Sequence, residues 1–237
     1  MKICLIGDSQ LGALKLAIDQ GLVETGGHDI AFFAAVAGKA LKFRLVDNAI
    51  QPGAVKDISY STQGAFAQVN PSAFDALVFY GTGLTFGNWM RPEDASLEPT
   101  ENYTPAFLAA CAQARIVRST CFKLAEAVAS APGWPRRLFI CPSPARSAPL
   151  GNRPEGNALL TLDALNTAAS ECAALIGAQY VPQPTATLAP GFYTQAEFSI
   201  GSRRLIANQP AHPIAERNHM NAAYGALMLR DILAALN

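Results

Sequence analysis

Two short polar clusters, at opposite ends of the chain, carry residue types suited to nucleophilic chemistry. Ser9 follows the apolar run of residues 2–6 and precedes apolar residues spaced three and four apart, so we expect it where a buried strand meets a helix. There the hydroxyl would project from the sheet edge, and backbone N–H groups would face any developing negative charge. A serine hydroxyl needs a base to become a nucleophile.

Three histidines could supply that base: His28, His212 and His219. His219 is favoured because Glu216 precedes it by three residues, just before the last expected helix. A carboxylate there can hold one ring nitrogen while the other faces the serine. His212, directly before Pro213, is interpreted as a loop residue that could contact a substrate.

The elements that must position these residues alternate between strand and helix. Short apolar runs predict strands at 2–6, 29–36, 74–80, 137–141 and about 178–181. Helical spacing predicts helices from Leu11 to Gly26-Gly27, from Pro105 to about Ser130, over about 157–176 and over 221–236. The stretches 45–72 and 84–103 are interpreted as long loops. The alternation predicts one α/β domain over residues 1–237, with a mostly parallel sheet covered by helices on both faces.

In such sheets, ligands bind at the carboxyl ends of the strands. Glycines mark three of the expected ends, at Gly7-Asp8-Ser9, Gly38 and Gly81-Thr82-Gly83. Neither G-x-G-x-x-G nor G-x-x-x-x-G-K-[ST] occurs, so a nucleotide-binding domain is disfavoured and no cofactor is expected. The residues expected to contact a substrate are Asp8, Gln10, Gly81, Gly83 and Trp89.

Gly7-Asp8-Ser9-Gln10 after the first strand, together with Glu216-Arg217-Asn218-His219 near the C-terminus, resembles the motifs of the SGNH/GDSL hydrolases. The resemblance implies a flavodoxin-like three-layer α/β/α sandwich with five parallel strands, and esterase or acetylesterase activity. It implies that Ser9 is the nucleophile, His219 the base and Glu216 the orienting acid. It also implies an oxyanion hole formed by backbone N–H groups of Ser9 and Gly38.

The sequence departs from the family at three points. The G-x-N-D motif reads Gly81-Thr82-Gly83-Leu84, so the asparagine donor is missing, and Asn88 is the expected replacement if its loop folds back. The D-x-x-H motif is E-x-x-H, and Gln10 replaces a hydrophobic residue. Losing one oxyanion donor typically lowers kcat by ~10²–10³. The alternative function is therefore a catalytically impaired SGNH-like protein that binds a ligand or partner.

Composition narrows the possible partners. The 237 residues include 18 basic and 18 acidic ones, so the net charge is zero, and only 15% of residues are charged against 50% hydrophobic. Without a basic excess, nucleic-acid binding is not expected. No apolar run approaches the ~18 residues of a membrane-spanning helix. A weak electrostatic field favours a neutral small-molecule acyl ester, for example an O-acetylated carbohydrate, as substrate of hydrolysis or acyl transfer. So few charges also favour a homo-oligomer.

The cysteines point to a reducing compartment. There are five of them, widely spaced and without C-x-x-C, so neither a disulfide framework nor a metal site is expected. Four lie in apolar contexts and are interpreted as small core residues. Since no signal-peptide pattern follows Met1, we expect a cytoplasmic protein.

Overall fold

A six-stranded sheet in the order β5-β2-β1-β6-β7-β8 forms the centre of the computed structural model, which describes residues 1–62, 67–86, 104–134, 137–148, 162–204 and 211–236. The strands are β1 (Lys2–Gly7), β2 (Asp29–Ala35), β5 (Ile58–Ser61), β6 (Ala76–Tyr80), β7 (Arg137–Cys141) and β8 (Gln179–Tyr180). Neighbouring strands pair in parallel, except that β5 runs antiparallel to β2.

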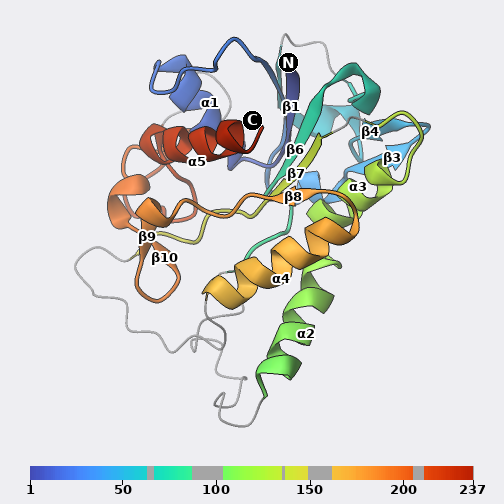
Figure 1. Cartoon of the computed structure of the whole chain (residues 1–237). Helices are drawn as coiled ribbons and strands as arrows, with labels where there is room; N and C mark the ends of the chain where they lie inside the picture. Colours follow the sequence, from blue (N-terminus) through green and yellow to red (C-terminus); the bar gives the residue numbers. More distant parts are fainter. Residues whose placement is uncertain (63–66, 87–103, 135–136, 149–161, 205–210, 237) are drawn as a thin grey trace.

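Helices cover both faces of this sheet (Figure 1). One face carries α1 (Leu11–Asp19) and α5 (Ala222–Ala235), and the other carries α2 (Pro105–Ile116), α3 (Thr120–Ala129) and α4 (Leu162–Leu175). Alternate residues of β1 serve the two layers, since Ile3 and Leu5 pack with α1 and α5 while Cys4 and Ile6 pack with the other helices. The parallel order β2-β1-β6-β7-β8 is that of flavodoxin-like folds. The predicted three-layer α/β/α class is confirmed.

The helices α1 and α5 touch backbone to backbone. A Cβ at Gly225 of α5 would lie 2.0 Å from the carbonyl oxygen of Ala13 in α1, so only glycine fits there. This contact matters for the site because α1 directly follows Ser9, whereas α5 directly follows the segment that carries His219.

Three predictions about elements are wrong. The helix expected from Pro105 to about Ser130 is two helices, because the Ser119 side chain accepts the backbone N–H of Phe122 and begins α3 anew. The first helix ends at Asp19, well before Gly26-Gly27. The stretch 45–72, interpreted as a loop, contains β5, which adds an antiparallel edge strand to the five parallel ones. Residues 87–103 lie outside the described part of the chain.

Smaller elements complete the described chain. Two hairpins pair β3 (Arg44–Val46) with β4 (Ala49–Gln51) and β9 (Leu188–Ala189) with β10 (Tyr193–Thr194). The 3-10 helices are η1 (Ala37–Lys42), η2 (Val55–Asp57), η4 (Pro71–Ala73), η7 (Thr185–Thr187) and η8 (Ala196–Phe198).

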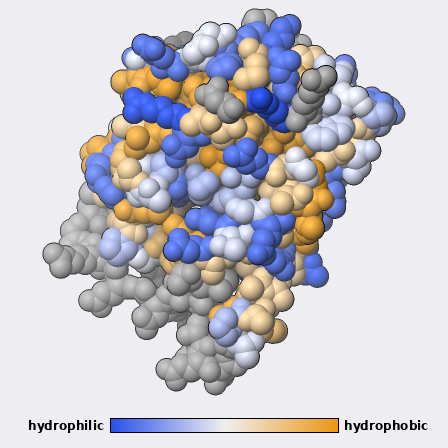
Figure 2. All heavy atoms as spheres, in the orientation of Figure 1, coloured by the Kyte–Doolittle hydropathy of each residue, from blue (hydrophilic) through white to orange (hydrophobic). Residues whose placement is uncertain are grey.

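The cysteines and the surface bear on two further expectations. All five cysteines are free, and Cys4, Cys121, Cys141 and Cys172 are buried. Burial raises the pKa of all four thiols, so they stay protonated and are poor nucleophiles. Among the described helices none has the length and apolarity to cross a membrane. On the face in Figure 2, polar and apolar residues are interspersed, and the expected homo-oligomer stays a prediction.

Candidate active site

Ser9 lies in the turn between β1 and α1, at the carboxyl edge of the sheet. The N–H groups of Leu11 and Gly12 donate to the carbonyl oxygens of Asp8 and Ser9, at 3.1 Å each, so a hydrogen-bonded turn leads from the serine into α1. The Asp8 carboxylate closes the same turn by accepting the N–H of Gln10 at 2.9 Å. These bonds fix the backbone that carries the hydroxyl.

The base proposed from the sequence is within hydrogen-bond distance of that hydroxyl. Ser9 Oγ lies 3.0 Å from Nε2 of His219, although 210 residues separate the two in the chain. Nδ1 of His219 lies 2.8 Å from Oε2 of Glu216. If the Nδ1 proton faces the carboxylate, the Nε2 lone pair faces the serine, which is the arrangement of a nucleophile with its base and an orienting acid.

The Glu216 carboxylate turns back toward the backbone of the residues that follow it. Its Oε1 accepts the N–H of Asn218 at 2.8 Å, and its Oε2 accepts the N–H of His219 at 3.0 Å. Burial alone would raise the pKa of Glu216, but these hydrogen bonds and the His219 imidazole lower the pKa below its ordinary value. The fold-back also takes up the methylene by which glutamate exceeds aspartate, so the carboxylate meets the imidazole.

Two side chains attach the His219 segment to the rest of the fold. Gln10 Nε2 donates to the carbonyl oxygen of Asn218 at 2.7 Å, joining the residue after the serine to the residue before the histidine. Arg217 Nε donates to the carbonyl of Ser147 at 2.7 Å, and the Ser147 N–H donates back to the Arg217 carbonyl at 2.8 Å. The side chain of Gln10 thus contacts the loop, and its expected contact with substrate stays a prediction.

Asp8 and Gly81 form a framework beside the serine. Burial raises the pKa of Asp8, and the N–H groups of Gln10 and Thr82 and the nearby His219 oppose this only in part. A Cβ at Gly81 would lie 2.8 Å from Ser143 Oγ and 3.2 Å from Asp8 Oδ2. With its left-handed φ of 70°, position 81 therefore requires glycine. The expected substrate contacts of Asp8 and Gly81 stay predictions.

For the remaining predicted site residues, the described part of the structure gives no direct contact with Ser9 or His219. Gly38 lies exposed in η1, which follows β2, the parallel neighbour of β1, so its N–H belongs to the same sheet edge as Ser9. Gly83, which stands at the asparagine position of the G-x-N-D motif named above, has no side chain to donate. A Cβ there would meet Leu41 of η1 at 3.0 Å, so Gly83 borders η1. Asn88 and Trp89 lie outside the described residues.

His212 also lies in the candidate site, although its sequence context predicts only a loop residue that could contact a substrate. Its ring stacks on that of His219, with centroids 4.2 Å apart and planes inclined by 8°. Its Nδ1 lies 4.0 Å from Oε2 of Glu216. Burial lowers the pKa of His212, and the nearby His219 and Arg204 lower it further. Glu216 opposes this decrease only in part. The spacing His-x-x-x-Glu-x-x-His was the signal available in the sequence.

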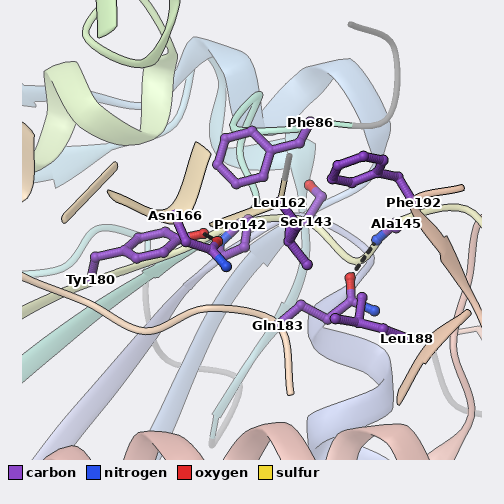
Figure 3. A pocket seen from close by; sticks show the side chains of 10 residues that line it. All are labelled: Phe86, Pro142, Ser143, Ala145, Leu162, Asn166, Tyr180, Gln183, Leu188 and Phe192. Carbon is purple, nitrogen blue, oxygen red and sulfur yellow. Dashed lines mark hydrogen bonds between the residues drawn. The ribbon is translucent and has the colours of Figure 1, made fainter. Parts of the chain in front are cut away.

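A small pocket lies at the carboxyl ends of β7 and β8 (Figure 3). Phe86 and Phe192 face it on one side, and Ser143 and Gln183 contribute polar groups. About 20 Å³ is open to the centres of water molecules, enough for about one water or a group of methyl size. Since Ser143 also faces Gly81, the pocket borders the framework beside the serine.

No family model matches the chain, and no curated protein matches it. It is similar to a solved structure of a carbohydrate esterase family 2 enzyme plus carbohydrate binding domain from Corynascus thermopiles (Myceliophthora fergusii), with 15% identity and a TM-score of 0.43, over 99% of this chain and 65% of that one. This chain thus spans slightly less than two thirds of that protein.

A second solved structure is a "putative arylesterase" from Agrobacterium tumefaciens str. C58, with 12% identity and a TM-score of 0.37, over 99% of this chain and 97% of that one.

Proposed function

We propose that this protein is a serine hydrolase that removes a small acyl group from an ester. The observation that carries the proposal is the continuous chain from Ser9 Oγ to His219 at 3.0 Å and from His219 to Glu216 at 2.8 Å. Nucleophile, base and orienting carboxylate at these distances can activate a serine hydroxyl at neutral pH.

In the first half of the reaction, Nε2 of His219 takes the Ser9 proton as Oγ bonds to the ester carbonyl carbon. Glu216 stabilises the imidazolium that forms. The backbone N–H groups of Ser9 and Gly38 hold the oxyanion, with Asn88 as a third proposed donor. The imidazolium then protonates the leaving alcohol, and the acyl group remains on Ser9.

In the second half, His219 deprotonates a water molecule that attacks the acyl-enzyme. The acid leaves, and Ser9 regains its proton from the imidazolium. A second alcohol in place of water would give acyl transfer with the same residues.

The proposed substrate is a neutral ester with an acyl group as small as acetyl, carried for instance by a carbohydrate. Zero net charge and few charged residues give no strong field to draw in a polyanion. The pocket lined by Ser143, whose hydroxyl lies near Gly81, has room for about one methyl-sized group. Trp89 is the proposed contact for the alcohol part.

Labelling with a fluorophosphonate probe and turnover of an activated acetyl ester test this proposal. The wild-type protein is expected to be labelled and to hydrolyse the ester, whereas Ser9→Ala does neither. Ser130→Ala, the same change at an exposed serine, serves as the matched control. If the wild-type protein shows no labelling and no Ser9-dependent turnover, the hydrolase proposal is overturned. The alternative, a binding protein impaired by the missing asparagine at Gly83, would then be favoured.

A further inference from the structure

We propose that His212, Glu216 and His219 form an inhibitory binding site for a divalent transition-metal ion such as Zn²⁺. The inhibitory part of this proposal rests on the proposed function, because the ion would bind the same histidine that serves as base. One ligand atom from each residue lies within 4.8 Å of the others. Two imidazoles and one carboxylate form a donor set that suits Zn²⁺ and leaves its fourth position open.

Both imidazoles present Nδ1 to the same carboxylate oxygen. Oε2 of Glu216 lies 2.8 Å from Nδ1 of His219 and 4.0 Å from Nδ1 of His212. In a tetrahedral site with bonds of about 2.0–2.1 Å, neighbouring ligand atoms are roughly 3.3 Å apart. The two distances from Nδ1 to Oε2 thus have to change by less than about 1 Å to accept an ion.

One movement completes the site. The two rings are nearly parallel, at 8°, so the lone pairs of the two Nδ1 atoms do not yet converge. Rotation of the His212 side chain aims its Nδ1 at the ion, while its backbone stays attached through the N–H bond to Ser202 at 3.0 Å. All three ligand residues are half-buried, so an ion from solvent can reach them.

An ion at Nδ1 would put the proton of His219 on the wrong nitrogen. In the active tautomer Nδ1 carries the proton beside Glu216, and the Nε2 lone pair faces Ser9 Oγ at 3.0 Å. A neutral imidazole that gives its Nδ1 lone pair to a metal carries its one proton on Nε2. Nε2 then donates to Oγ and cannot take its proton. The exchange releases no net proton, and it stops hydrolysis without unfolding the chain.

Calorimetric titration of Ser9→Ala with Zn²⁺ tests binding without catalysis, because this variant keeps all three ligands. One ion per chain is expected. Adding His212→Phe keeps a stacking ring but removes a ligand atom, so the affinity should fall by more than about tenfold. Adding His28→Phe makes the same change outside the site and should leave the affinity unaltered. Equal affinity with and without His212→Phe overturns the site.

Ester turnover, measured first in the presence of a chelator and then at increasing Zn²⁺ concentrations, tests inhibition. The midpoint of inhibition should match the calorimetric dissociation constant and rise more than about tenfold in His212→Phe. Binding of one ion with unchanged turnover overturns the inhibitory role. Absence of Ser9-dependent turnover in the chelator overturns the proposed function, and the inhibitory role with it, while calorimetry still decides whether the metal site exists.

Discussion

Replacing Glu216 by glutamine removes the negative charge beside His219 while keeping the length of the side chain. Oε2 faces two N–H groups of His219, and Oε1 faces the N–H of Asn218. An amide has one acceptor oxygen and one donor NH₂ group. Whichever way the amide turns, the NH₂ group meets an N–H, so the variant loses a hydrogen bond as well as the charge.

The expected loss of activity follows from the electrostatics of the imidazolium. Two unit charges about 4 Å apart attract by about 1 kcal/mol in water and about 4 kcal/mol at an effective dielectric constant of 20. Because Glu216 and His219 are both half-buried, we expect an intermediate loss of about 2–3 kcal/mol. Since 1.36 kcal/mol corresponds to a factor of ten, kcat should fall roughly 30- to 150-fold.

Initial rates of activated-ester hydrolysis, fitted to kcat and KM, provide the assay. KM should change little, because the carboxylate acts on the transition state through His219. Glu197→Gln makes the same change at an exposed glutamate and should keep wild-type kcat. A Glu216→Gln protein that retains kcat within threefold of wild type, with an unaltered Tm, would refute the role assigned to the carboxylate.

Two further predictions concern stability. Gly225→Ala should destabilise the fold by about 3 kcal/mol in urea unfolding, because the added methyl overlaps the Ala13 carbonyl; Gly38→Ala, with open space around it, is the comparison, and equal effects would contradict the close contact. The raised pKa of Asp8 means that its folded form holds a proton more tightly than the unfolded chain. The contribution of Asp8 to the free energy of unfolding is fully present below its pKa in the unfolded chain and is lost as pH rises through its raised pKa in the folded protein. The stability of wild type relative to Asp8→Asn should therefore decline between these two pKa values. A relative stability that rises or stays level with pH would contradict this.

The central strands were predictable because their signal is local. The strand expected at 137–141 is observed as Arg137–Cys141, where four consecutive buried residues follow one exposed one. By contrast, β5 consists of half-buried residues and pairs with β2 across an irregularity between Ala34 and Ala35. It therefore has no continuous apolar run, and its strand conformation depends on pairing with β2. The break between α2 and α3 was missed because apolar spacing continues through it, although α2 ends at Ile116 and the cap at Ser119 begins a new helix.

The candidate site likewise has one part that local sequence could predict and parts that depend on the tertiary structure. The pairing of Glu216 with His219 depends on three residues of local spacing, so the sequence could suggest it. The meeting of His219 with Ser9 depends on contacts between distant segments, namely α1 against α5 and Gln10 against Asn218. The stack of His212 on His219 arises in an irregular segment. Outside a helix or strand, the spacing of two residues in the sequence does not predict whether their side chains point the same way.

The two halves of the candidate site are held by different kinds of structure, and this difference determines where we expect the proposed activity to be regulated. Ser9 continues from β1, which is hydrogen-bonded on both sides by β2 and β6. Moving the serine would therefore disrupt the core of the sheet. His219 lies on an irregular segment held by individual hydrogen bonds, such as those of Gln10 to Asn218 and of Ser147 to Arg217, each contributing about 1 kcal/mol. Its ring and tautomer can change at little cost to the fold, so we expect a ligand that competes for Nδ1 to switch off the proposed base while leaving the proposed nucleophile in place.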